Sequence, residues 1–188
     1  VKVVLDCGNG VGSLVGVELL EALGAEVVPL YCESDGTFPN HHPDPTVDEN
    51  LVDLIETVRR EGAELGIGFD GDADRIGAVD ENGQIVRGDL LLLLFGLDIL
   101  RTRGAGQKLV FDVKCSQVVS NEFERAGGEG SAVEDGRLDQ SRVTAKKDRS
   151  AFAIALLRNV ELRVYLLNFS HRGGQTNVHH FDPAIGGR

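Results

Sequence analysis

Short apolar runs alternate with helix-like stretches along the first half of the chain. Lys2–Leu5, Glu26–Tyr31 and Leu65–Phe69 are short and almost continuously apolar, as buried parallel strands are. Val15–Leu23 and Val47–Arg60 instead carry apolar residues at helical spacing, and Asp48 is the expected cap of the second helix. The alternation predicts an α/β fold that opens with a strand–helix–strand unit.

A hairpin is expected next. Ile76–Val79 and Gln84–Val86 flank the turn Asp80-Glu81-Asn82-Gly83, and Asn-Gly between apolar runs is a strong hairpin signal. An antiparallel pair added to parallel strands gives a mixed sheet, which we expect to carry helices on both faces. Residues 1–89 are predicted to form this domain.

A second, incomplete α/β domain is predicted for residues 90–128. Leu90–Leu100 has a broad apolar face, Lys108–Val113 resembles a buried strand, and Gln117–Arg125 has helical spacing. The pattern decays in residues 129–188, for which we predict no element and expect a divergent tail, either disordered or read in a shifted frame.

Charge changes at the same point. Residues 1–128 hold 10 Lys/Arg against 23 Asp/Glu, a net of −13, whereas residues 129–188 hold 9 against 7, a net of +2. The overall net charge of −11 argues against nucleic acid and anionic membrane surfaces as partners.

Other bulk features indicate a cytoplasmic protein. We find neither an apolar run long enough to cross a bilayer nor a signal peptide. The three cysteines have no metal-binding spacing and suggest buried thiols in a reducing compartment. Because the chain opens on Val1 inside a strand pattern, we expect it to be a piece of a longer protein.

The strongest chemical signal is an acidic loop directly after Leu65–Phe69. Asp70, Asp72 and Asp74 alternate with the small residues Gly71 and Ala73, which allow a tight bend. Three converging carboxylates repel one another unless a cation lies among them. Mg²⁺ prefers such oxygen ligands and keeps positions open for phosphate. Arg75 follows, with a guanidinium shaped for carboxylate or phosphate.

Other interpretations of this loop are weaker. A solvated acidic turn would not require three acids at perfect alternation. An EF-hand would need Gly where Arg75 stands, with helices on both sides. A haloacid-dehalogenase-type phosphatase, with Asp70 as nucleophile, fits the strand and the first two acids but requires Thr or Val in place of Asp74.

Two further motifs carry less information. The turn Gly8-Asn9-Gly10-Val11-Gly12 resembles a dinucleotide-binding loop, but Ser13 stands where the third glycine belongs. His41 and His42 are adjacent, and in an extended segment their side chains point to opposite faces, so one cation would rarely bind both.

Residues 1–128 resemble the α-D-phosphohexomutases, the phosphomannomutase/phosphoglucomutase group. The resemblance rests on Leu5–Gly12, Pro29–Pro45, Gly68–Asp89 and Val110–Ser116, and it corresponds to the family's second domain and the start of its third. The family more often has Gly in place of Ala73.

The resemblance implies a reaction and roles for five residues. In these enzymes a phosphoserine exchanges its phosphoryl group with a hexose phosphate, moving phosphate between C1 and C6 of mannose or glucose. Asp70, Asp72 and Asp74 match the Mg²⁺ ligands, and Arg75 and Lys114 match basic residues that face the substrate. For Lys114 alone, a solvated lysine at a strand end would otherwise be the simpler interpretation.

The family's serine loop, its sugar-recognition loop and its C-terminal phosphate-binding loop are absent from this sequence. We therefore expect no catalytic residue in this chain, no mutase activity from it alone, and the missing domains of the same enzyme as partners. A dehalogenase-type phosphatase and a non-catalytic module that binds Mg²⁺ or phosphosugar remain the alternatives.

The family usually continues with Trp-Lys-Thr-Gly where this chain has Val133-Glu134-Asp135-Gly136. Codons for these four residues, read one nucleotide later, can spell the family sequence. A shifted reading frame after about Gly128 is therefore the hypothesis for the tail.

Overall fold

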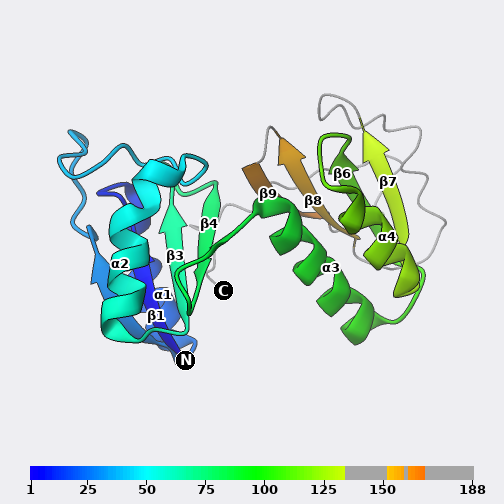
Figure 1. The fold of residues 1–188 in the computed structure, drawn as a ribbon, viewed down its shortest axis with the longest axis horizontal. Coiled ribbons are helices and arrows are strands. Elements are labelled where there is room, and N and C mark those ends of the chain that lie inside the picture. Colours follow the sequence, from blue (N-terminus) through cyan, green and yellow to red (C-terminus); the bar gives the residue numbers. More distant parts are fainter. Residues whose placement is uncertain (134–151, 159–160, 168–188) are drawn as a thin grey trace, which may run out of the picture. The chain divides into compact units, whose positions relative to one another are not determined.

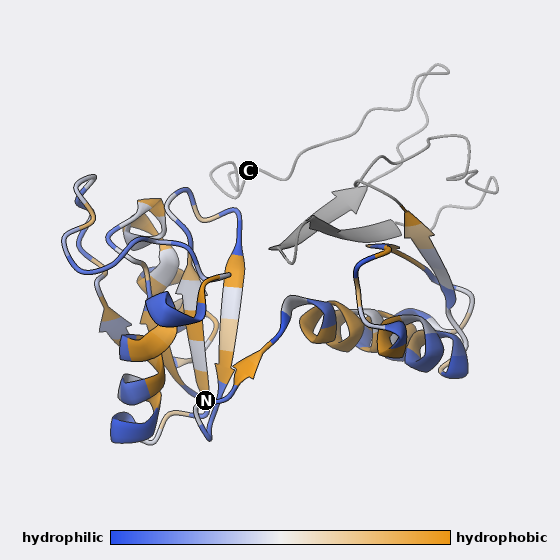
Figure 2. Ribbon diagram, turned by 45° about the horizontal axis from the view of Figure 1, so that its top comes forward, coloured by the Kyte–Doolittle hydropathy of each residue, from blue (hydrophilic) through white to orange (hydrophobic). Residues whose placement is uncertain are grey.

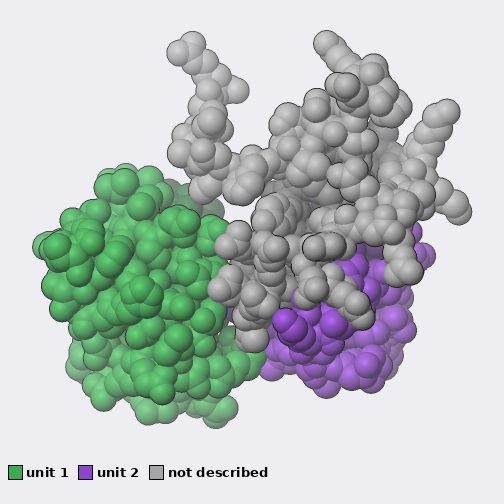
Figure 3. All heavy atoms as spheres, turned by 90° about the horizontal axis from the view of Figure 1, so that it is seen from above, with its two compact units in different colours: residues 1–88 green, residues 89–188 purple. Residues whose placement is uncertain are grey.

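The computed structural model describes residues 1–133 and the backbone course of residues 152–158 and 161–167. These residues fall into two compact units, Val1–Gly88 and Asp89–Arg188 (Figure 3). Each unit is described by itself.

The first unit is built on a mixed five-stranded sheet with the order β2-β1-β3-β4-β5 (Figure 1). β1 (Lys2–Asp6) lies between β2 (Glu26–Leu30) and β3 (Leu65–Phe69) and is parallel to both. β4 (Ile76–Asp80) and β5 (Ile85–Val86) continue the sheet as an antiparallel hairpin. The predicted mixed sheet is thereby confirmed.

Helical segments cover both faces of this sheet. They are η1 (Val11–Leu14), α1 (Gly16–Ala22), η2 (Asp48–Leu51) and α2 (Val52–Glu61). Neighbouring residues of β1 show the two faces, since Val4 belongs to the buried cluster that α2 closes and Leu5 lies against Gly16 at the start of α1. The helices on both faces therefore agree with the prediction.

The cluster under α2 is the apolar core of the first unit. Its fully buried members come from β1, η2, α2, the turn after α2, and β4: Val4, Leu51, Leu54, Val58, Ala63 and Val79. Gly66 of β3 provides room for α2, because a Cβ at that position would lie 2.7 Å from Cγ2 of Val58. Close packing of α2 therefore fixes the strand that leads into the acidic loop.

The predicted cap Asp48 is wrong. The second helical segment begins as the 3₁₀ turn η2, whose first residue is Asp48, and the preceding Val47 has no side-chain capping bond. The carboxylate of Asp48 instead accepts two hydrogen bonds from the guanidinium of Arg87, at 2.6 and 2.8 Å. Arg87, directly after the hairpin strand β5, therefore binds the carboxylate that was expected to cap the helix.

The second unit contains helices and paired strands. Its elements are α3 (Gly88–Arg103), β6 (Lys108–Asp112), α4 (Gln117–Arg125), β7 (Glu129–Val133), β8 (Phe152–Arg158) and β9 (Glu161–Leu167). β7 pairs with β6 in parallel and β9 pairs with β8 antiparallel. α3 is hydrophobic around most of its circumference (Figure 2), and Gly96 lets it approach Phe123 of α4.

The sequence pattern predicts no element after Gly128, but β7, β8 and β9 lie there. Glu129–Val133 is short and has little apolar character, so its strand is fixed by pairing with β6 rather than by its own pattern. The change of frame expected after about Gly128 stays a hypothesis, and three of the four residues on which it rests, Glu134–Gly136, lie outside the described residues. Among the helices described, none is long and apolar enough to cross a membrane.

Candidate metal centre

The acidic loop joins β3 to β4 and is closed by its own backbone. The amide of Asp70 donates to the carbonyl of Arg75 at 3.3 Å, and the amide of Ala73 donates to the carbonyl of Asp70 at 3.1 Å. Ala73 has a positive φ of 59°, a conformation that glycine adopts at no steric cost. Strands on both sides, rather than helices, are inconsistent with an EF-hand.

The structure brings the three predicted metal ligands together. One carboxylate oxygen from each of Asp70, Asp72 and Asp74 can be chosen so that all three lie within 4.8 Å of one another. Asp70 is buried, whereas Asp72 and Asp74 are exposed. Three hard oxygen donors, two of them open to solvent, suit a divalent cation that keeps free positions for water or phosphate. The donor set therefore fits Mg²⁺.

Arg75 neutralises part of this charge and orients Asp70. Its backbone amide donates to Oδ1 of Asp70 at 3.0 Å, and its Nε donates to Oδ2 at 2.6 Å. The same guanidinium reaches Oδ1 of Asp44 at 3.1 Å and lies 3.8 Å from Oδ1 of Asp74. Arg75 thus binds carboxylates of its own unit, and its contact with substrate stays a prediction.

The pKa of Asp70 reflects this crowding. Burial raises the pKa of its carboxyl above the ordinary value, the hydrogen bonds and charge of Arg75 lower it, and the nearby charge of Asp72 raises it. The net direction is upward, so without a cation this carboxylate is held at an electrostatic cost. A cation among the acids would relieve that cost.

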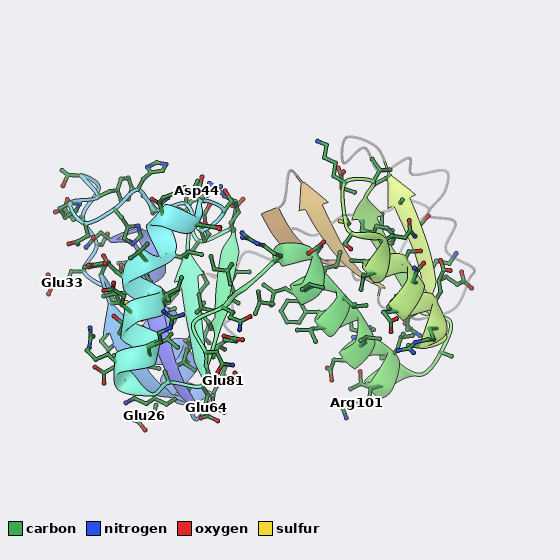
Figure 4. All side chains as sticks on the ribbon, in the orientation of Figure 1. Glu26, Glu33, Asp44, Glu64, Glu81 and Arg101 are labelled. Carbon is green, nitrogen blue, oxygen red and sulfur yellow. The ribbon has the colours of Figure 1, made fainter. Side chains whose placement is uncertain are left out.

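Asp44 was not identified from the sequence as part of the site. It lies in the long loop before η2, at the same end of the unit as the acidic loop (Figure 4). Its Oδ1 accepts hydrogen bonds from the amide and hydroxyl of Thr46 at 3.0 and 2.7 Å, and from Arg75. Asp-x-Thr after Pro43 was a local turn signal, but its pairing with Arg75 spans 31 positions and has no local signature.

The glycine turn after β1 packs against the acidic loop and hydrogen-bonds to it. The amide of Val11 donates to the carbonyl of Gly71 at 2.9 Å, and Gly10 packs against Gly71 itself. The segment connects β1 to η1, as the predicted strand–helix–strand unit requires, but no local pattern in the sequence indicates its contact with Gly71.

The two adjacent histidines take no part in the acidic cluster. Nε2 of His41 lies 3.0 Å from Oδ2 of the buried Asp6, and its Nδ1 lies 3.0 Å from the carbonyl oxygen of His42. Burial raises the pKa of Asp6, opposed by the Gly8 amide and by His41. Over residues 1–133, the cluster of Asp70, Asp72 and Asp74 is the one group whose geometry could hold a metal ion.

Lys114 lies in the second unit, two residues after the end of β6. Its backbone amide donates to Oδ1 of Asp112 at 2.9 Å, and the residue is exposed. Its predicted role in substrate binding therefore rests on the sequence resemblance.

Comparison with known proteins gives a consistent result. The family profile described as "Phosphoglucomutase/phosphomannomutase, alpha/beta/alpha domain II" matches residues 1–83. A phosphomannomutase/phosphoglucomutase from Pseudomonas putida is 54% identical over 127 residues, which cover 68% of this chain and 27% of that protein. A phosphoglucomutase from Neisseria meningitidis serogroup A is 47% identical over 128 residues, covering 68% of this chain and 28% of that protein.

A solved structure shows the same relationship in three dimensions. The phosphoglucomutase/phosphomannomutase family protein from Burkholderia thailandensis superposes with a TM-score of 0.77 at 36% identity, covering 88% of this chain and 35% of that one. The matching stretch is only about a quarter of the length of the two curated relatives. Within that limit the comparisons agree with the fold, and the chain belongs to the phosphoglucomutase/phosphomannomutase family, with residues 1–83 matching its domain II.

Proposed function

We propose that this chain is the metal-binding part of a Mg²⁺-dependent phosphohexomutase that interconverts hexose 1-phosphate and hexose 6-phosphate through a phosphoserine. The observation that carries the proposal is the convergence of Asp70, Asp72 and Asp74 on one point, in a segment matched by the family's domain II. The hexose is mannose or glucose, and the protein acts in the cytoplasm.

The chain's own residues would hold the cation and fix its position. Asp72 and Asp74 present exposed carboxylates, and Asp70 is held rigidly by Arg75. When bound, Mg²⁺ would offset negative charge on the transferring phosphoryl group, where most of the catalysis of such transfers lies. Arg75 and Lys114 would supply fixed positive charge for the phosphate.

In this proposal the serine that carries the phosphoryl group lies in the part of the longer relatives that this chain does not match, and those further domains would be the partners of this chain. Effective catalysis of this reaction needs serine, metal and sugar in one place. The chain alone should accordingly bind Mg²⁺ without turning over glucose 1-phosphate.

A dehalogenase-type phosphatase is a weaker candidate. Its nucleophile would be Asp70, but this side chain is 1% exposed and both of its oxygens accept hydrogen bonds from Arg75. A nucleophile needs an oxygen that can approach a phosphorus atom. Phosphate release from a hexose phosphate by the chain, lost in Asp70→Asn, would favour this candidate instead.

Calorimetric titration with Mg²⁺ tests the metal site directly. Asp72→Asn removes one exposed carboxylate and should weaken binding roughly tenfold or more, about 1.4 kcal/mol. Glu81→Gln is the matched control, because it removes the same charge from the turn of the hairpin, at the opposite end of the unit from Asp44 (Figure 4). Equal affinities in the two variants would contradict the proposed centre.

A chimaera tests the enzyme. Residues 1–128 would replace the corresponding segment of the Pseudomonas putida relative, which supplies the remaining domains. We expect Mg²⁺-dependent mutase activity, and its loss with Asp72→Asn. A chimaera that melts like the parent enzyme but has no activity would refute the proposal. If that inactive chimaera still binds Mg²⁺, the chain is a binding module instead.

A further inference from the structure

Two cysteines meet at the carboxyl ends of β1 and β2, the same end of the first sheet as the acidic loop, and neither belongs to the acidic cluster. Cys7 follows β1 and Cys32 follows β2, and these two strands are parallel neighbours with Asp6 opposite Leu30. The amide of Cys7 donates to the carbonyl of Leu30 at 3.1 Å, which continues the ladder beyond the strands. The pairing of the strands therefore brings two residues 25 positions apart in the chain into contact.

The contact is between the sulfur atoms themselves. Sγ of Cys32 lies 2.8 Å from Sγ of Cys7, about 0.8 Å longer than a covalent S–S bond. Small rotations of the two side chains would suffice to reach bonding distance. Both residues are free thiols in this structure.

The two thiols differ in access and in acidity. Cys7 is fully buried, whereas Cys32 is partly exposed. The contact with Cys7 lowers the pKa of the Cys32 thiol, and the same contact together with burial raises the pKa of Cys7. Thiolate is the nucleophilic form, so Cys32 is the sulfur suited to react first. Cys7 is then placed to attack it.

We propose that Cys7 and Cys32 form an oxidation site that closes to a disulfide on reaction with a low-molecular-weight disulfide, RSSR. The thiolate of Cys32 attacks one sulfur of RSSR, forming a mixed disulfide and releasing RS⁻. Cys7 then attacks the Cys32 sulfur, an S–S bond forms between them, and the second RS⁻ leaves. Two protein thiols are oxidised by two electrons, RSSR is reduced to two RSH, and the two thiol protons end on these products.

The place of this pair in the fold gives the reaction a structural consequence. Cys7 directly precedes the glycine turn, and the amide of Val11 in that turn holds the carbonyl of Gly71. The new bond would tie the start of this turn to the second residue after β2. The inference concerns the thiols and does not depend on the proposed mutase function.

Treatment of the folded 188-residue chain with oxidised glutathione, followed by intact-mass measurement, tests the proposal. We expect a mass loss of about 2 Da, two hydrogen atoms, with no glutathione retained on Cys7 or Cys32. Cleavage after glutamate separates the two sites, since Val1–Glu18 contains Cys7 and Val27–Glu33 contains Cys32. The two peptides should be found linked.

Variants assign the order of attack. Cys7→Ser should accumulate a stable glutathione adduct on Cys32, because no second thiol remains to displace it. Cys32→Ser, which changes the less buried position, should form neither an adduct at Cys7 nor a protein disulfide. A matching circular dichroism spectrum shows that each variant is folded.

Three outcomes would overturn the proposal: a lasting glutathione adduct on Cys7 or Cys32 in the unmodified chain, a disulfide that involves Cys115, or a Cys7–Cys32 pair that stays reduced in the folded chain but couples in urea. Since Cys115 lies in the second unit, its reaction provides an internal control for general thiol reactivity.

Discussion

Gly10 lies so close to the backbone of Gly71 that a side chain on Gly10 is excluded at their contact. A Cβ added to Gly10 would stand 2.7 Å from the carbonyl oxygen of Gly71, and the amide of Val11 binds that same oxygen. Gly10 has an ordinary φ of −83°, so the requirement for glycine is one of space alone. The turn after β1 and the loop of three acids therefore form one packed unit.

Gly10→Ala should for this reason weaken Mg²⁺ binding without unfolding the chain. The new methyl group must push the backbone at Gly71 away, and this moves the neighbouring Asp70 and Asp72. We expect a loss of roughly tenfold in the calorimetric affinity, about 1.4 kcal/mol. Gly36→Ala is the control, because a Cβ there meets nothing within 4 Å. Unchanged affinity in Gly10→Ala would show that the contact does not position the acids.

The pairing of Asp44 with Arg75 should stabilise the first unit in a pH-dependent way. Burial alone would raise the pKa of Asp44, but hydrogen bonds from Thr46 and the charge of Arg75 outweigh it, and the pKa lies below its ordinary value. A lowered pKa means that the folded state favours the carboxylate. Its contribution is present above the unfolded pKa, near 3.8, and is lost as the pH falls through the lower folded value.

Asp44→Asn keeps an oxygen for Thr46 but removes the charge opposite Arg75. We expect a loss of about 1 kcal/mol in the free energy of unfolding at pH 7, shrinking toward zero as the pH falls below about 3.8. Urea denaturation across this range measures it. Asp35→Asn is the matched control, since Asp35 binds the amide and hydroxyl of Thr37 in the same way but is fully exposed. A loss at pH 7 as large in the control would assign the effect to the turn rather than to Arg75.

Ala73→Gly should stabilise the chain. Ala73 has a φ of 59°, where an L-residue with a Cβ is strained by about 1–2 kcal/mol, and glycine is not. Part of the gain is offset because glycine makes the unfolded chain more flexible, so we expect a net increase of about 0.5–1 kcal/mol. Ala22→Gly, in the last turn of α1, should have the opposite sign. Thermal denaturation of both variants measures the two changes. A destabilised Ala73→Gly would mean that the strain at Ala73 is smaller than the cost of the more flexible unfolded chain.

Elements of both units could be predicted because their signals are local. The strand Leu65–Phe69 and the helix in Gln117–Arg125 have the bounds expected from apolar spacing and the flanking residues. The alternation of Asp70, Asp72 and Asp74 likewise predicts that their carboxylates converge, because alternate carboxylates on a tight bend have few other arrangements.

What escaped prediction depends on pairs that lie far apart in the sequence. Asp48 is a residue type that often caps helices, but its carboxylate binds Arg87, which is 39 positions away in the sequence. β7 is a strand because β6 is beside it, and nothing within Glu129–Val133 indicates this. Sequence periodicity reports which face of an element is buried, but not which distant side chain will meet a given carboxylate.

The two helices on the first sheet should differ sharply in their tolerance of truncation. Leu54 of α2 is fully buried in the core cluster, whereas Leu19 of α1 is 55% exposed. Leu54→Ala removes buried methyl groups and leaves a cavity, so we expect a loss of about 2–5 kcal/mol in the free energy of unfolding. Leu19→Ala removes the same atoms from a site already in water and should change it by at most about 0.5 kcal/mol. Urea denaturation measures both, and since each is a leucine-to-alanine change in a short helix, propensity cancels in the comparison. Equal losses would contradict the prediction. They would mean that Leu19 is buried in solution, although it is exposed in this structure.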